Sequence, residues 1–153
     1  MGRRSFLLLL VFVSGCVTTT TTVTRPEKRD VTELVQLAGD AIIVKEHISF
    51  PHGKADIDEG SLDLLDRVAE ILKTTQAITK LTIEGHTDTT GDPDFNLPLS
   101  EARALAVKKY LESKGVAPDR LEARGFGAEQ PMDSNDTDAG RAKNRRVEFK
   151  VTR

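Results

Sequence analysis

Alternating apolar and polar residues predict several β-strands along this chain. The period of two over residues 42–50, 80–83 and 146–152 is typical of half-buried strands. A weaker alternation over residues 33–38 precedes a Gly-Asp turn signal and predicts a hairpin with the strand that follows. Residues 120–126 give one more short strand before the last.

Two longer stretches have helical periodicity. Residues 61–73 place five apolar side chains on one stripe, which predicts an amphipathic helix: Leu62, Leu65, Val68, Ala69 and Leu72. The second helix is predicted to begin at Ser100, whose hydroxyl suits an N-cap, and to end before Gly115. Residues 139–144 suggest a short helix or turn.

The order of these elements predicts the fold class. A strand–helix–strand–helix–strand–strand order indicates an α+β sandwich, with the helices on one face of a mixed sheet. The chain has 153 residues, of which 38% are apolar and 30% charged, as expected of a single globular domain. The net charge is −2 and no basic cluster occurs, which argues against a nucleic-acid partner.

The N-terminus has the features of a targeting segment. Arg3 and Arg4 precede a short apolar run at residues 6–13, as in a signal peptide. The sequence Val-Ser-Gly-Cys at residues 13–16 then resembles a bacterial lipobox, in which Cys16 would be lipidated; an ordinary secretory signal with a chance cysteine is the alternative. We therefore expect a lipoprotein signal peptide (1–15), a Thr-rich tether (16–32) and one domain (33–153).

An acidic and a basic residue are expected to meet at one rim of the domain. Asp88 follows the strand at residues 80–83, and Arg103 is predicted to lie in the first turn of the next helix. Arg103 can bind a carboxylate with two parallel hydrogen bonds, Asp88 can accept from an ammonium group, and Asn96 lies between them in sequence. Such a pair suits a zwitterion. The alternative is that Asp88 caps its own loop and Arg103 pairs with a surface carboxylate.

Asp88 and Arg103 belong to a series of short sequence motifs. Gly-His-Thr-Asp at residues 85–88 is followed by Gly91, Asn96, Leu-Ser-x-x-Arg-Ala at 99–104 and Gly-Arg-Ala-x-Asn-Arg-Arg-Val-Glu-Phe at 140–149. Together they resemble the OmpA-like peptidoglycan-binding domain, which peptidoglycan-associated lipoproteins and MotB-type stator proteins carry. The resemblance covers roughly residues 42–151.

The resemblance implies a ligand and a set of site residues. Asp88 and Arg103 would bind diaminopimelate of the cell-wall stem peptide, which keeps a free ammonium and carboxylate on its side chain. The helix N-terminus would add favourable amide and dipole contacts to that carboxylate. The other implied site residues are Asn96, Leu99, Phe50, Gly53 in the loop after it, and Arg146 in preference to Arg145.

The function implied is non-enzymatic. The chain would be an outer-membrane lipoprotein that faces the periplasm and anchors that membrane to peptidoglycan, with Tol-type periplasmic proteins as further partners and no cofactor. The alternative is a hydrolase or metal-dependent enzyme acting on the wall. His47, His52 and His86 lack the spacing of a zinc protease motif, so no metal site is expected, and His86 is expected to pack or hydrogen-bond under the loop.

Overall fold

The structure, a computed structural model, describes residues 31–51 and 53–153. The predicted signal peptide, the lipobox and nearly all of the tether lie outside these residues. Val31 is only 5% exposed and belongs to the hydrophobic core. The core therefore includes a residue that was predicted to lie in the tether.

The domain is built on a five-stranded mixed sheet with the order β1-β2-β5-β3-β4. β3 and β4 are parallel, and the other neighbouring strands are antiparallel. The predicted α+β class and the predicted hairpin of the first two strands are confirmed. The strands are β1 (Val35–Ala38), β2 (Ala41–Val44), β3 (Lys80–Gly85), β4 (Leu121–Gly125) and β5 (Val147–Thr152).

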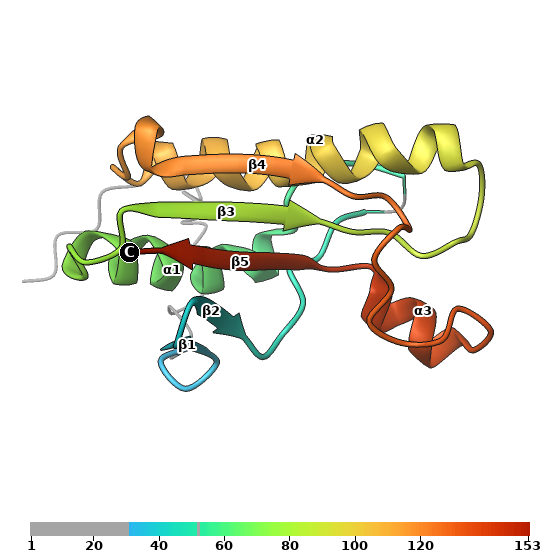
Figure 1. The fold of residues 1–153 in the computed structure, drawn as a ribbon, viewed down its shortest axis with the longest axis horizontal. Coiled ribbons are helices and arrows are strands. Elements are labelled where there is room, and N and C mark those ends of the chain that lie inside the picture. The colour runs from blue at the N-terminus through green and yellow to red at the C-terminus, as the bar shows by residue number, and fades with distance from the viewer. Residues whose placement is uncertain (1–30, 52) are drawn as a thin grey trace, which may run out of the picture.

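Two helices cover one face of this sheet. Figure 1 shows α1 (Leu62–Thr74) and α2 (Pro93–Ser113) on the same side, while α3 (Asp138–Asn144) lies beyond the start of β5. Short 3₁₀ turns, η1 (Glu59–Ser61) and η2 (Pro118–Arg120), precede α1 and β4. The core between the layers holds fully buried side chains from both: Leu65, Val68 and Leu72 of α1, Val107 and Leu111 of α2, and Leu81 and Ile83 of β3.

The second strand is shorter than predicted. β2 ends at Val44 instead of continuing to Phe50, because Val44 pairs with Val35, where its partner β1 begins. Past that point the hairpin has one further backbone bond, from Lys45 N to the Leu34 carbonyl at 2.8 Å. Ile48 is nevertheless buried, and Phe50 packs against the core. The alternation over residues 42–50 therefore reflects burial on both sides of a bend.

The start of α2 also differs from the prediction. Asp92 is the N-cap, with its side chain accepting from Asp94 N at 2.9 Å, and Pro93 occupies the first helical position. Ser100 is fully buried inside the helix, where its Oγ donates to the Leu97 carbonyl at 2.7 Å. Arg103 consequently lies in the body of α2 and not in its first turn.

Two strand-end glycines let α2 approach the sheet closely. A Cβ on Gly85, at the end of β3, would lie 2.1 Å from the Ser100 carbonyl oxygen. A Cβ on Gly125, at the end of β4, would lie 2.4 Å from the backbone nitrogen of Glu101. No side chain fits in either place, so the backbones of helix and strands meet directly.

We expect Gly125→Ala to destabilise the domain by about 1–3 kcal/mol, because the new methyl group must displace helix backbone. Gly60→Ala is the matched control, since its Cβ would meet only the Asp58 carboxylate, at 3.6 Å. The measurement is urea unfolding of each variant. Equal stability of the two variants would show that α2 can move away from β4 at little cost.

Candidate functional site

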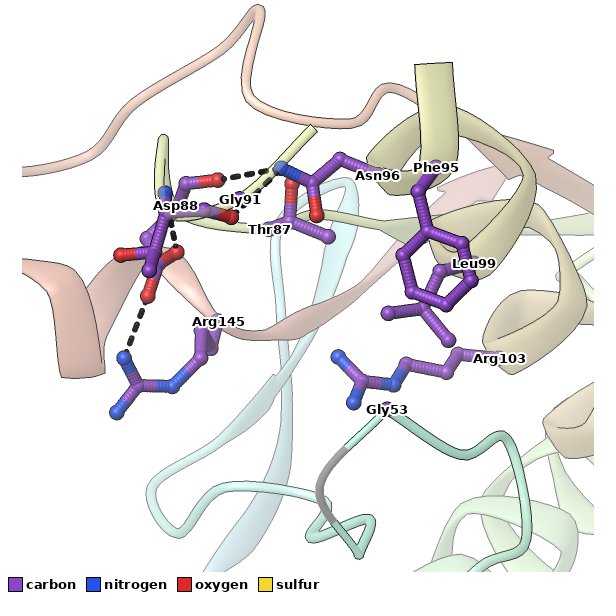
Figure 2. Close-up of a pocket in the computed structure, with 10 residues that line it drawn as sticks. Gly53, Thr87, Asp88, Gly91, Phe95, Asn96, Leu99, Arg103 and Arg145 are labelled. Atoms are coloured by element: carbon purple, nitrogen blue, oxygen red, sulfur yellow. Dashed lines mark hydrogen bonds and ion pairs between the residues drawn. The ribbon is translucent and has the colours of Figure 1, made fainter. Parts of the chain in front are cut away.

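A pocket of about 480 Å³ lies at one end of the sheet. The ends of β3 and β4, the starts of α2 and β5, and α3 all gather at this end (Figure 1). Figure 2 shows the side chains that surround the pocket, which come from four separate segments of the chain. The lining residues are Gly53, Thr87, Asp88, Thr90, Gly91, Phe95, Asn96, Leu99, Arg103 and Arg145.

Asp88 is a fixed carboxylate on the pocket wall. It is 5% exposed, its Oδ1 accepts from Thr90 N at 2.8 Å, and its Oδ2 accepts from Arg145 Nη1 at 2.5 Å. Burial by itself would raise the pKa of this carboxyl, but the hydrogen bonds from Arg145 and Thr90 outweigh burial and leave the pKa below its usual value. Asp88 thus caps its own loop, as the alternative interpretation proposed, and also lines the pocket.

Arg103 lies across the pocket from Asp88 (Figure 2). Its Nε donates to the Lys54 carbonyl at 3.0 Å, and its guanidinium carbon lies 5.1 Å from the centre of the Phe50 ring. Burial lowers the pKa of Arg103, the charge of Arg145 lowers it further, and Asp88 opposes both. The contacts with Lys54 and Phe50 hold one side of the guanidinium, and Figure 2 shows its terminal nitrogens pointing into the pocket.

Asn96 holds the loop that carries Asp88. Its Nδ2 donates to the Thr90 carbonyl at 3.0 Å and to the Asp88 carbonyl at 3.4 Å, and the residue is 7% exposed. Asn96 therefore contacts the loop of Asp88, and its amide nitrogen is occupied by backbone carbonyls. Its first role is to join the start of α2 to the loop after β3.

The structure brings Arg145 to the pocket instead of Arg146. Arg146 donates from Nε to Glu148 at 2.6 Å and from Nη2 to the Gln130 carbonyl at 3.2 Å, away from the pocket. The prediction that Arg146, in preference to Arg145, lies at the pocket is therefore wrong. Arg145 follows the last residue of α3, whereas Arg146 leads into β5, so the two neighbouring side chains point to different places.

The remaining predicted residues divide into two groups. Gly53 and Leu99 line the pocket with Asp88, Asn96 and Arg103, whereas Phe50 supports Arg103 from beside it. Sequence reasoning missed five lining residues: Thr87, Thr90, Gly91, Phe95 and Arg145. Three of these belong to the same loop as Asp88, so that loop's polar composition was the available signal. The sequence around Phe95 gave no such signal. In the structure this residue is 55% exposed, at the rim of the pocket.

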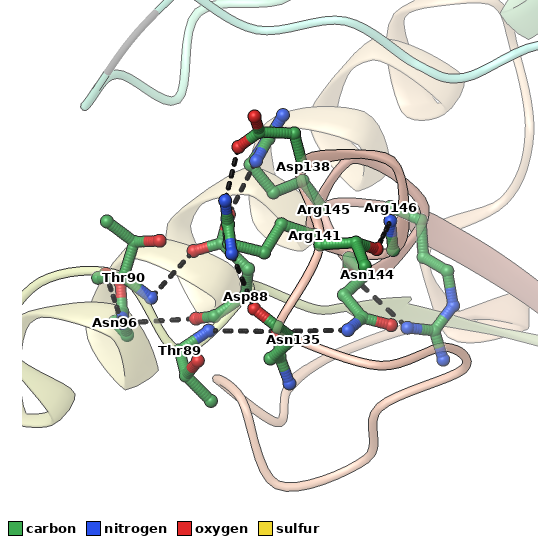
Figure 3. A network of polar contacts seen from close by, with 12 residues as sticks. Asp88, Thr89, Thr90, Asn96, Asn135, Asp138, Arg141, Asn144, Arg145 and Arg146 are labelled. Atoms are coloured by element: carbon green, nitrogen blue, oxygen red, sulfur yellow. Dashed lines mark hydrogen bonds and ion pairs between the residues drawn. The ribbon is translucent and has the colours of Figure 1, made fainter.

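A polar network fixes the side of the pocket that carries Arg145. Asn144, fully buried at the end of α3, donates to Asn135 Oδ1 at 3.0 Å, and Thr89 N donates to the same oxygen at 3.3 Å (Figure 3). Asn144 Oδ1 in turn accepts from the backbone of Met132 and Asp133. Loop 132–135, α3 and the Asp88 loop are thereby joined next to Arg145.

Neither of the two described histidines, His47 and His86, lines this pocket. His47 is exposed, and residue 52 lies outside the described part of the chain. His86 is 2% exposed and stacks on Phe126, with 5.4 Å between ring centres and 11° between planes. It packs beneath the loop, as expected, and burial together with the charge of Arg146 lowers its pKa.

The comparison with known families decides the classification. The OmpA family matches residues 49–145. The chain belongs to the OmpA family. The predicted resemblance is thus confirmed, and it places the chain among non-enzymatic binding domains. In the described part of the chain, no helix has the length and apolarity needed to cross a membrane.

Individual relatives show how far the similarity extends. Peptidoglycan-binding protein ArfA of Mycobacterium tuberculosis is 43% identical over 104 residues, 68% of this chain and 32% of ArfA. Probable lipoprotein YiaD of Escherichia coli is 35% identical over 120 residues, 77% of this chain and 54% of YiaD. The chain therefore spans about a third of the length of ArfA and about half of the length of YiaD.

A solved structure shows the same fold. The peptidoglycan-associated lipoprotein from Burkholderia pseudomallei superimposes with a TM-score of 0.62 at 29% identity, covering 69% of this chain and 87% of the other. The OmpA-like architecture predicted from the sequence is confirmed by this likeness.

We expect Asp88→Asn to lower the free energy of unfolding by about 1–2 kcal/mol at neutral pH, because it removes the charge that Arg145 and Thr90 stabilise. The folded-state pKa of Asp88 is depressed, so its contribution is complete above its unfolded value and is lost as pH falls through the folded value. The gap between wild type and variant should therefore shrink below about pH 4 in urea unfolding.

Asp119→Asn is the control for this measurement, because Asp119 is exposed and its loss changes the net charge equally. A gap that is the same at pH 3 and pH 7 would contradict the proposed role of the Asp88 charge.

Proposed function

We propose that this domain binds peptidoglycan non-covalently through diaminopimelate of the stem peptide, and that a lipid on Cys16 ties it to the outer membrane. Membership of the OmpA family supports the first part. ArfA is named a peptidoglycan-binding protein, and the Burkholderia structure is that of a peptidoglycan-associated lipoprotein. YiaD, named a probable lipoprotein, supports the second part.

The charge of the pocket is the observation that carries the proposal. Two guanidiniums, those of Arg103 and Arg145, and one carboxylate, that of Asp88, line the same space. Arg145 is already paired with Asp88, so the pocket keeps one excess positive charge on the side of Arg103. A ligand carboxylate that enters there completes the charge balance and forms charge-assisted hydrogen bonds.

The same pocket can accept a ligand ammonium group. A carboxylate has about four lone-pair sites, and Asp88 uses one on each oxygen for Thr90 and Arg145. The ammonium of diaminopimelate would bind the sites that remain, while its carboxylate binds Arg103. This retains the predicted roles of Asp88 and Arg103, adds Arg145 as the residue that orients Asp88, and makes Asn96 a support of the loop.

The apolar lining suits the carbon chain of such a ligand. Phe95 and Leu99, on adjacent turns of α2, lie on the Arg103 side of the pocket (Figure 2). A zwitterionic head with an aliphatic chain needs both charged and apolar contacts. An amino acid with a free side-chain terminus therefore fits the lining better than a sugar.

The serine nearest to the motif, Ser100, is not placed as the nucleophile that the enzymatic alternative would need. Ser100 is buried within α2, donates to the Leu97 carbonyl and accepts from Gly127 N at 2.9 Å. It is not among the residues that line the pocket. Its role is to join helix and loop, so we propose binding without turnover. Tol-type periplasmic proteins as further partners remain a prediction from the resemblance.

Arg103→Ala is expected to weaken binding to diaminopimelate-type cell walls about tenfold to a hundredfold, because one charge-assisted contact contributes roughly 1.5–3 kcal/mol. Arg103→Lys should restore only part of the affinity, since an ammonium group cannot bind a carboxylate in the two-pronged way. Co-sedimentation with purified sacculi measures the effect, and free diaminopimelate should compete.

Arg67→Ala is the matched control, because Arg67 lies on α1 and pairs with the exposed Glu70. Sacculi that carry lysine in place of diaminopimelate lack the side-chain carboxylate and should bind wild type poorly. A folded Arg103→Ala variant that sediments as wild type does would refute the site assignment. Breakdown of the sacculi by the wild type would refute the binding-only function.

Cys16→Ser is expected to release the protein from the membrane fraction, because each buried CH₂ of an acyl chain contributes about 0.8 kcal/mol to membrane affinity. Mass spectrometry of the wild type should find an acylated Cys16 at the mature N-terminus. Wall binding of the variant should be unchanged, which separates the anchor from the pocket. A soluble wild-type product cleaved at another residue would rule out the anchor.

A further inference from the structure

A second group of chemically reactive side chains lies on β3 and β5, outside the pocket. Glu84 and Glu148 are directly opposite each other in the antiparallel register of these strands. His86 follows two residues after Glu84 and is 2% exposed. One ligand atom from each of these three residues lies within 4.8 Å of the other two.

Two features of this group are unfavourable without a further charge. Neither ring nitrogen of His86 has a hydrogen-bond partner in the described part of the chain, although the ring is almost fully buried. Buried polar groups are normally hydrogen-bonded. Like charges directly opposite on neighbouring strands also repel unless cations balance them, and Glu84 and Glu148 form such a pair, balanced in this structure by Lys150 and Arg146. A cation between the three side chains would relieve both.

We propose that Glu84, His86 and Glu148 bind one divalent transition-metal ion, and that Zn²⁺ suits them best. One imidazole nitrogen and two carboxylate oxygens are common zinc ligands, and a water molecule can complete a tetrahedron. Ligands about 2.0–2.2 Å from zinc lie roughly 3.3–3.6 Å apart. The distances between the three ligand atoms therefore need to shorten by at most an ångström or so, and rotation of the two glutamate side chains can achieve this.

Two basic residues now neutralise the carboxylates, and they differ in mobility. Lys150 Nζ lies 2.5 Å from Glu84 Oε2, but its side chain is 52% exposed and can turn into solvent. Arg146 Nε donates to Glu148 Oε1 at 2.6 Å, and its side chain is 10% exposed. The ion would thus displace Lys150, while Arg146 would keep holding one oxygen of Glu148 and leave the other for the metal.

The group can be reached from solvent. A hollow of about 330 Å³ is lined by Arg146, Glu148 and Lys150 among others, and the side chain of Glu148 is 29% exposed. His86 lies two residues before Asp88, so an ion here would join β3 to β5 directly beneath the ligand-binding loop. The expected role is structural, and it does not depend on what the pocket binds.

Zinc titration of the full chain in detergent tests the proposal, with Cys16→Ser in every sample so that no thiol competes. Calorimetry should give one ion per chain with a dissociation constant of about 10 µM or tighter, and zinc should raise the melting temperature. His86→Gln and Glu148→Gln should each weaken binding at least about tenfold. Cobalt should give the absorption spectrum of a tetrahedral site.

Three further variants keep the result unambiguous. Glu122→Gln removes a half-buried carboxylate of β4 that pairs with Lys80, and the double variant His47→Gln/His52→Gln removes the other histidines. Both should bind zinc as the parent does. Lys150→Met should bind severalfold more tightly, because the competing ammonium is gone, and misfolding cannot produce that gain. Absence of saturable binding below about 1 mM, or binding lost in the double variant and kept in His86→Gln, would overturn the proposal.

Discussion

The contact between α2 and the ends of β3 and β4 is the constraint on which the site depends. Gly85 and Gly125 leave no side chain between strand and helix, so the helix backbone lies directly against both strand ends, at Ser100 for β3 and at Glu101 for β4. Ser100 Oγ then accepts from Gly127 N and joins the helix to the loop after β4. Arg103 lies about one turn beyond this contact, and Asp88 lies three residues beyond Gly85. The distance between the side chains of Asp88 and Arg103 is therefore set by close packing of backbone, which deforms very little.

Ion pairs and hydrogen bonds also hold the pocket segments together. The Asp88–Arg145 pair joins the loop after β3 to the end of α3, and the Asn135–Asn144 network holds the same two segments from the side (Figure 3). Arg145 is half exposed, so its ion pair supplies only part of the stabilisation of the Asp88 charge, together with the hydrogen bond from Thr90 N. Its effect is to orient Asp88 and to leave Arg103 as the guanidinium without a carboxylate in the pocket. The proposed binding and the anchoring of the loop thus use the same ion pair.

Much of this arrangement could be predicted from the sequence, because buried side chains recur at regular intervals along a helix or strand. The stripe of α1 and the alternation of β3 and β5 follow directly from which side chains meet the core, and the strand-end position of Asp88 follows from β3. Features that depend on contacts between distant segments could not be read in this way. Arg145 and Arg146 are adjacent and identical in type, and only the direction of the chain between α3 and β5 decides which one reaches Asp88. The early end of β2 depends likewise on where its partner β1 begins.

The start of α2 shows the same limit and changes the view of how the site recognises an anion. Pro98 favours a helix that begins after it, since proline lacks an N–H and crowds the carbonyl four residues earlier. The helix begins at Pro93 nonetheless, because Asp92 caps it and the Asn96 side chain binds the Thr90 and Asp88 carbonyls. Arg103 then lies too far from the helix N-terminus for its dipole to matter, since that effect falls off within the first turn. The proposed recognition of a carboxylate would therefore come from the guanidinium itself, with its planar, two-pronged geometry as the source of selectivity.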